Sequence, residues 1–263
     1  METDSLSLGV AGEPGLHPIG ARMPDEYQRD EKTFGRLFRL YEEELCLLQN
    51  DACRRCDAVV KQPLAMWHVG ADYFNSDRRV LFVGKPHRGC LDGARPSGVV
   101  DPWAVTDELR SSSWAYWRYT SDIANELHGD EGWSRIALTN VVKCTNVTGE
   151  NGSLDRTSST MVEQCVGQLD VITAEIRILQ PTHIVMYTAS FFPDSLKNVS
   201  LGAAGAWATD TDGKRACGKK MLRWQERSAS AEWGGQLKLL VTGHPERMRR
   251  TEYTSMIARW LRS

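Results

Sequence analysis

The sequence lacks the features that mark membrane-spanning and secreted proteins. No stretch of its 263 residues is apolar for the length that a transmembrane helix needs, and the N-terminus has no apolar signal-peptide core. We therefore expect a cytoplasmic protein with no membrane partner. We also expect a monomer. An apolar content of 41% and a charged content of 25% are typical of a soluble globular chain.

The chain also lacks internal repeats and a clear domain boundary. We expect a flexible tail over residues 1–24 and one α/β domain over residues 25–263, which begins with a helical extension. Apolar strands alternate with helices of 3.6-residue periodicity, which predicts a three-layer α/β/α sandwich around a mostly parallel sheet. The expected strands are 79–84, 136–138, 182–187 and 237–241, the expected helices are 25–50, 114–127, 161–179 and 252–261, and a hairpin is possible within 191–235.

The number of cysteines is also not even. The seven cysteines are an odd number in a chain without a secretion signal, which argues against a disulfide framework. Metal ligation or free thiols are the remaining interpretations. The pair Cys53-Arg-Arg-Cys56 has the C-x-x-C spacing of metal sites and, with two distant cysteines, could hold a four-iron cluster or a tetrahedral zinc ion.

Three expected strands end in polar loops marked by Gly or Pro. These loops are Gly84–Gly93, Thr139–Lys143 and Gly243–Arg250. Because the carboxyl ends of parallel strands share one edge of the sheet, we expect the three loops to form one site there. The amide of Asn140 offers a donor and an acceptor, which suits the edge of a nucleobase. The alternative is a strand that simply ends in an Asn turn.

From Cys53 to the C-terminus, the chain resembles the uracil-DNA glycosylase superfamily, in particular its iron–sulfur branch (family 4 and relatives). Thr139-Asn-Val-Val-Lys-Cys144 repeats a motif of that branch letter for letter, and Pro181–Val185 and His244-Pro245 follow in order. The resemblance implies the uracil-DNA glycosylase fold and a 4Fe–4S cluster. Its ligands would be Cys53, Cys56, Cys144 and Cys165.

The resemblance also implies roles for single residues. His244 would stabilise charge on the departing base, and Asp92 would orient water or stabilise the sugar cation. The family's Gly-Glu-Ala-Pro-Gly loop reads Gly84-Lys85-Pro-His87-Arg here, and Leu91 replaces a second acid. His87 therefore becomes a further catalytic candidate. Gly84, Lys85 and Asn140 would contact the substrate, and Trp103 would stack on the base in place of a missing family phenylalanine. The alternatives are a turn aspartate, a loop histidine and a core tryptophan.

Positive charge is concentrated near the C-terminus. Residues 214–263 carry 12 basic and 4 acidic side chains, a net of +8, in a chain whose net charge is −2. The loop after Pro245 contains Arg247, Met248, Arg249 and Arg250, and in the family this loop enters the minor groove of DNA. Arginines there would bind phosphates and Met248 would fill the vacated base stack. The alternative is a basic helix start.

Together these features predict a DNA glycosylase. It would flip a uracil-like or modified pyrimidine, including a bulky one of the kind found in phage DNA, and hydrolyse its N-glycosidic bond to leave an abasic site. The replaced acids leave open a second class, a module on the same fold that binds such a base without cutting. A third is a zinc-bound nucleotide-processing enzyme.

Overall fold

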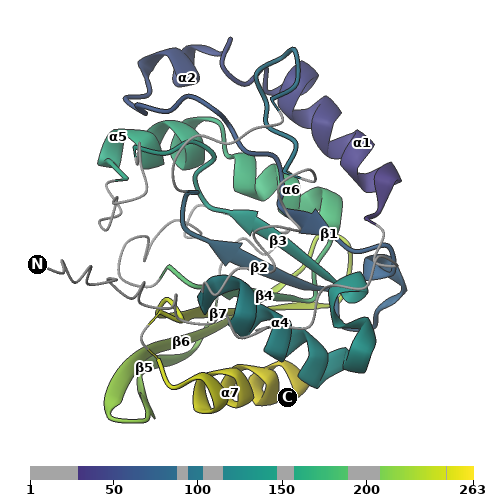
Figure 1. The fold of residues 1–263 in the computed structure, drawn as a ribbon, viewed down its shortest axis with the longest axis vertical. Coiled ribbons are helices and arrows are strands. Elements are labelled where there is room, and N and C mark those ends of the chain that lie inside the picture. The colour runs from purple at the N-terminus through teal and green to yellow at the C-terminus, as the bar shows by residue number, and fades with distance from the viewer. Residues whose placement is uncertain (1–28, 88–93, 103–114, 147–156, 189–207, 247) are drawn as a thin grey trace, which may run out of the picture.

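The computed structural model describes residues 29–87, 94–102, 115–146, 157–188, 208–246 and 248–263. These residues form a mixed α/β fold built on one seven-stranded sheet with the order β1-β3-β2-β4-β7-β6-β5 (Figure 1). The strands are β1 (His68–Val69), β2 (Val80–Gly84), β3 (Ile136–Asn140), β4 (His183–Met186), β5 (Ala208–Cys217), β6 (Lys220–Ser230) and β7 (Gln236–Thr242).

The four central strands β3, β2, β4 and β7 are parallel, as the alternation of strands and helices predicts. The flanks differ from the prediction of a mostly parallel sheet, because β1, β6 and β5 pair antiparallel with their neighbours. For β5 and β6 a short connection forces the antiparallel pairing. Strands β5 and β6 are joined by a two-residue turn, and such a turn can connect only antiparallel strands.

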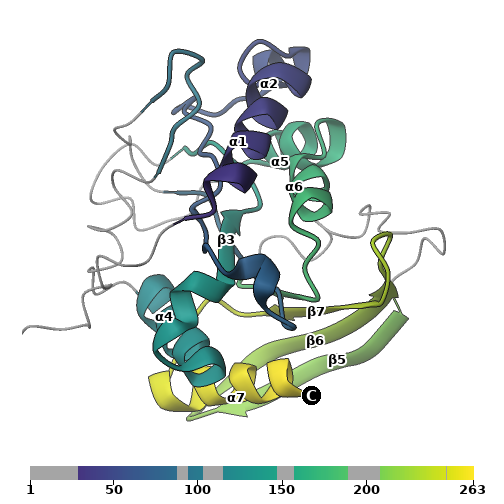
Figure 2. The ribbon, with the colours of Figure 1, turned by 90° about the vertical axis from the view of Figure 1, so that its right-hand side faces the viewer.

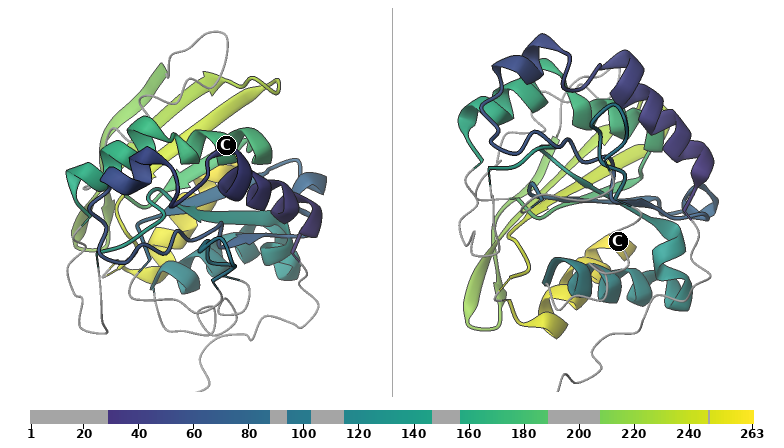
Figure 3. Two further views of the ribbon diagram at one scale, coloured as in Figure 1. Left: turned by 90° about the horizontal axis from the view of Figure 1, so that it is seen from above. Right: turned by 45° about the horizontal axis from the view of Figure 1, so that its top comes forward.

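Helices lie on both faces of the sheet (Figure 2 and Figure 3, right). One face carries α1 (Glu31–Arg39), α2 (Asp51–Arg55), α5 (Ser159–Val162) and α6 (Val171–Leu179), and the other carries α4 (Ala115–His128) and α7 (Arg250–Arg262). Residues alternate between the faces along each strand. On β2, Leu81 and Val83 join the apolar cluster that contains α1 and α6, and Phe82 joins the cluster that contains α4 and α7.

Two predicted helices are interrupted. The region expected as one helix over 25–50 is α1 followed by a π-helical turn, Leu40–Glu44, and 161–179 is α5, a second π-helical turn, Glu163–Gln168, and then α6. Asp170 adopts a left-handed conformation with φ of 50°, which ends the first part before α6 begins. Among the described residues, no helix has the length and apolar character needed to cross a membrane.

Candidate functional site

Polar side chains gather at the carboxyl edge of the parallel strands. Gly84 ends β2, Asn140 ends β3, and the two are paired in register. Thr188 follows β4, and Thr242 ends β7. The side chains of Asn140 and Thr188 each carry a buried polar atom with no hydrogen-bond partner among the described residues. Buried polar atoms are rarely left unpaired, so this edge is a candidate ligand site.

Asn140 is the most constrained of these residues. It is 4% exposed, and its Nδ2 is buried without a partner in the described part of the chain. Its Oδ1 would lie 2.8 Å from a Cβ placed on Gly84, and the ring of Tyr116 would lie 3.0 Å from the same point. The absence of a side chain at Gly84 therefore makes room for the amide and the tyrosine ring. The Tyr116 hydroxyl is also buried and unpaired among these residues.

A row of tyrosines leads from Asn140 to the loop that contains His244. The rings of Tyr116 and Tyr187 meet edge to face at 5.7 Å, and Tyr187 lies 6.2 Å from Tyr253. Tyr253 continues to Tyr119 at 5.7 Å. Burial raises the pKa of Tyr116, Tyr187 and Tyr253, so these phenols stay neutral hydrogen-bond donors at physiological pH.

Two of these hydroxyls hold the His244 loop in place. Tyr253 donates to the carbonyl of Gly243 at 2.7 Å, and Tyr119 donates to the carbonyl of Met248 at 2.8 Å. The ring of His244 is partly exposed, and its Nδ1 accepts the backbone N–H of Glu246 at 3.2 Å. With Nδ1 as the acceptor, the neutral ring carries its proton on Nε2. The contact at Nδ1 therefore favours the tautomer with the proton on Nε2.

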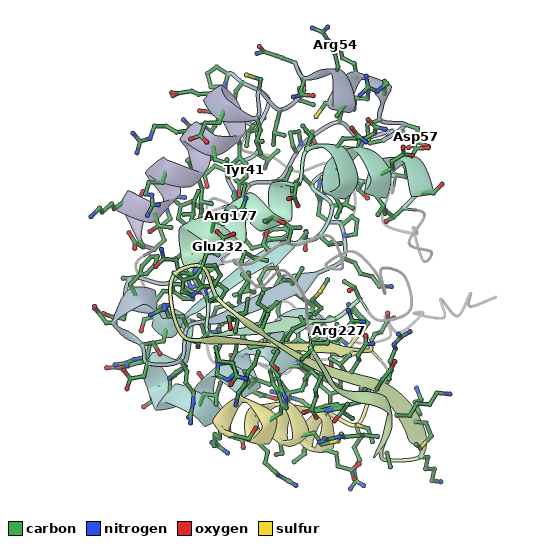
Figure 4. The ribbon with its side chains drawn as sticks, turned by 180° about the vertical axis from the view of Figure 1, so that it is seen from behind. Tyr41, Arg54, Asp57, Arg177, Arg227 and Glu232 are labelled. Atoms are coloured by element: carbon green, nitrogen blue, oxygen red, sulfur yellow. The ribbon has the colours of Figure 1, made fainter. Side chains whose placement is uncertain are left out.

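The two polar neighbours of Asn140 in its motif face the opposite side of the sheet. The ammonium of Lys143 contacts Oε1 of Glu175 at 2.5 Å and donates to Oγ1 of Thr139 at 2.6 Å. Glu175, on α6, also accepts from Thr139 and from the hydroxyl of Tyr41, which lies between α1 and α6 (Figure 4). The lysine and glutamate side chains are 2% and 0% exposed. This network ties the Asn140 strand to α6.

The four cysteines named from the sequence come together beside this network. Burial raises the pKa of the Cys144 thiol, and the thiols of Cys165, Cys56 and Cys53 raise it further. Burial also raises the pKa of Cys165 to about 12, while the backbone amide of Lys143 acts in the opposite direction. Segments far apart in sequence are joined here, since Val60 and Thr145 form a β-bridge. The structure thus brings the two halves of the predicted ligand set together.

The grouping of these thiols is not that of an assembled metal site. Within the described ranges, no group of three or more His, Cys, Asp or Glu side chains is arranged to hold a metal ion. The four thiols lie near enough to one another to affect the pKa of Cys144, without forming such a group.

The remaining predicted residues of the first loop are only partly described. His87 is buried, and its Nε2 lies 3.1 Å from the carbonyl of Gln62, which fixes the ring against the main chain. Lys85 directly follows β2 and is partly exposed. Asp92 and Trp103 lie outside the described residues.

The predicted DNA-binding loop shows three different environments. Arg249 is 72% exposed and pairs with Glu252 at 2.6 Å. Arg250 donates two hydrogen bonds to the carboxylate of Asp122 on α4, a bidentate ion pair. These hydrogen bonds raise the pKa of Arg250. Met248 packs against the apolar core. Arg247 lies outside the described residues. Arg249 is therefore the most exposed arginine of this loop in the described part of the chain.

Sequence reasoning missed the tyrosine row and the partner of Lys143. Glu175 could have been found, because it lies on the apolar stripe of its helix, between Ile172 and Ile176. A charge in that position predicts a buried partner. The tyrosines carry no such signal, because an aromatic residue at helical spacing most often belongs to the hydrophobic core.

Neither the protein-family models nor the curated proteins compared with this sequence match it.

Proposed function

We propose that this protein is a DNA glycosylase of the uracil-DNA glycosylase type, with that family's three-layer α/β/α arrangement. It would draw a uracil-like or modified pyrimidine out of DNA and hydrolyse the bond between the base and its sugar. The observation that carries the proposal is Asn140. Its amide is 96% buried at the carboxyl edge of the sheet and has an unused donor, and it lies beside the ring of Tyr116.

A flipped pyrimidine suits this arrangement. Its ring edge alternates hydrogen-bond donors and acceptors, which the amide of Asn140 matches. The hydroxyl of Tyr116 supplies a second polar contact, and its ring supplies an apolar wall. A base that pairs with both groups would recover the free energy that burial of unpaired groups costs, about 1–3 kcal/mol for each.

His244 supplies the polar chemistry at the departing base. Negative charge grows on the base oxygen as the glycosidic bond breaks, and the Nε2–H of a neutral imidazole can donate to that oxygen. The contact of Nδ1 with the backbone N–H of Glu246 favours this tautomer. One such donor contributes roughly 3 kcal/mol to transition-state stabilisation. A carboxylate at Asp92 would orient the attacking water or stabilise the positive sugar.

Cys53, Cys56, Cys144 and Cys165 would hold a 4Fe–4S cluster as a structural element. It would join the N-terminal segment to the stretch that carries Asn140, and the reaction needs no electron transfer. The mutual influence of the four thiols and the amide of Lys143 near Cys165 support this assignment, since N–H donors stabilise ligated sulfur. Zinc is the alternative metal.

A second candidate is a module that binds a modified base without cutting it. Lys85 and Leu91 stand where the family has acids, and the His87 ring is held by the Gln62 carbonyl. Fewer groups are then available to activate water in the first loop.

Single-turnover cleavage of duplexes with different modified pyrimidines separates the two candidates. We expect an abasic product on at least one duplex, and a rate loss of about 30-fold to 1,000-fold for His244→Ala, equivalent to about 2–4 kcal/mol. Asn140→Ala should also slow cleavage far more than it weakens binding, and exposed Asn125→Ala on α4 is the matched control. If His244→Ala and Asn140→Ala both cut at the wild-type rate, the active site lies elsewhere. Tight binding of one modified duplex without any cleavage would favour the binding module.

A further inference from the structure

The β5–β6 hairpin extends past the edge that carries the candidate site. Strand β6 stays paired with β7 only up to the pair Trp224 and Thr242, but its pairing with β5 continues to Cys217 and Lys220. Residues 220–223 therefore run beyond the carboxyl end of β7, a distance of about 13 Å at 3.3 Å per residue. Figure 1 shows this end of the hairpin beside the start of α7.

The turn at the end of the hairpin is anchored by contacts with the start of α7 and the residue before it. Gly218, with φ of 60°, occupies the first position of a two-residue turn, where a positive φ matches the twist of the strands. Its backbone N–H donates to the Glu252 carboxylate, and the thiol of Cys217 faces the carbonyl of Arg249. Glu252 also pairs with Arg249. The hairpin end is thus fixed against the predicted DNA-binding loop.

The two faces of this hairpin end have different characters. Leu222 and Trp224 are buried against the α7 side of the core. The opposite face carries the cross-strand pairs Lys214–Arg223 and Ala216–Met221. Met221 is 62% exposed, one of few large apolar side chains that are so accessible in the described chain. Most of the Met221 side chain is therefore open to solvent, beside basic residues.

Charge on this segment has one sign. Residues 213–223 contain five basic side chains and no acidic one. Lys214 and Lys219 are exposed, and neither has an ion-pair partner among the described residues. Such a segment attracts a polyanion, and an apolar side chain among phosphate-binding lysines can enter a DNA groove.

We propose that the end of the β5–β6 hairpin is a second DNA-contacting element, in which Lys214 and Lys219 bind backbone phosphates of a duplex and Met221 packs in its minor groove. The proposal rests on the proposed function for the place where DNA docks, the carboxyl edge of the sheet. Continuity with the exposed Arg249 and the reach past the edge favour a duplex lying across both elements.

Salt-dependent binding of the full-length protein to an unmodified duplex tests the proposal. In the double variant Lys214→Gln with Lys219→Gln, the negative slope of log affinity against log salt should become shallower by about 1.8, since each phosphate contact contributes about 0.9. If the contribution of a contact vanishes at 1 M salt, the loss of each lysine lowers the affinity at 0.1 M salt about eightfold. Met221→Ser should weaken binding at every salt concentration without changing the slope. The control Arg259→Gln, exposed near the far end of α7, should leave both quantities unchanged.

The outcomes separate this proposal from the glycosylase proposal. A slope unchanged in the lysine variant, with its melting temperature intact, overturns the hairpin assignment even if the protein cleaves modified DNA. A reduced slope supports it even if no duplex is cleaved. An equal loss of binding to a polyglutamate chain would show a general preference for acidic polymers and would also overturn the assignment to duplex DNA.

Discussion

The buried pair of Lys143 and Glu175 allows a sharp test of the structure. Glu175→Gln keeps the shape of the side chain and removes its charge, which leaves the Lys143 ammonium buried without a counter-ion. Removing one partner of a buried pair costs about 3–5 kcal/mol. The amide also replaces one of the two carboxylate oxygens that accept from Tyr41 and Thr139. We expect a loss at the upper end of that range.

A surface pair supplies the matched control. Arg177 and Glu232 contact each other at 3.1 Å between α6 and the β6–β7 turn, and their side chains are 49% and 39% exposed (Figure 4). The same change, Glu232→Gln, should cost less than about 1 kcal/mol because solvent screens the pair. The double variant Lys143→Met with Glu175→Leu removes both buried charges. It should recover much of the lost stability. The recovery should be incomplete, because the hydroxyls of Tyr41 and Thr139 lose the carboxylate that accepts their hydrogen bonds.

The measurement is the free energy of unfolding from urea titrations followed by far-ultraviolet circular dichroism, at equal iron content in every variant. A loss below about 1 kcal/mol for Glu175→Gln, similar to that of Glu232→Gln, would refute the buried pair. So would a double variant that is less stable than Glu175→Gln, because the charge left behind would then not be the source of the cost.

Three further predictions address the thiols, the pH dependence and the substrate edge. Cys165→Ser should abolish the visible iron–sulfur absorbance and lower iron per chain, whereas Cys46→Ser should change neither; an iron-free wild-type protein would contradict the ligand set. Burial, with Lys238 and Arg78 nearby, lowers the pKa of His183 to about 4, so the neutral ring adds stability that is complete above pH 6.5 and is lost as the pH falls towards 4. The free energy of unfolding lost in this way is about 3 kcal/mol, at about 1.4 kcal/mol per unit of pKa shift. His183→Gln should flatten the dependence of the unfolding free energy on pH between pH 7 and 4.5, and equal slopes in variant and wild type would contradict this. Gly84→Ala should cost about 1–3 kcal/mol of stability and slow cleavage further, because its methyl group would displace the Asn140 amide; wild-type rates on the same duplex would show that the amide can move freely.

The sequence predicted well where a residue's own chemistry decided its place. The apolar runs before Gly84, Asn140 and Thr242 predicted buried parallel strands, and polar residues after such runs fall at the shared edge. These features depend on local pattern, which periodicity reports directly. The four predicted cysteine ligands lie near one another, and in the described ranges they do not form a group that could hold a metal ion, so the ligand set stays a prediction.

Features that depend on distant partners could be predicted only in part. The place of Glu175 on an apolar stripe indicates a buried partner, but nothing in the sequence indicates that its partners are Lys143 and Tyr41, which lie 32 and 134 positions away from it. The place of Tyr116 over Gly84 depends on how α4 packs on the sheet. The distance by which β6 extends beyond β7 is set by the register of β6 against β7, which no local pattern indicates. The sequence shows only that this part of the chain is basic.

The alternation of faces along Thr139–Lys143 has a consequence for folding. Strand β3 is buried on both sides, so the apolar character of Ile136 to Leu138 does not by itself distinguish one face from the other. The polar residues would not, because a slip would turn Thr139 away from Glu175 and drive the Asn140 amide towards it. The buried charge of Glu175 thus favours one register of strand β3. A chain without it should form more misregistered, slowly refolding species even where its final stability is preserved.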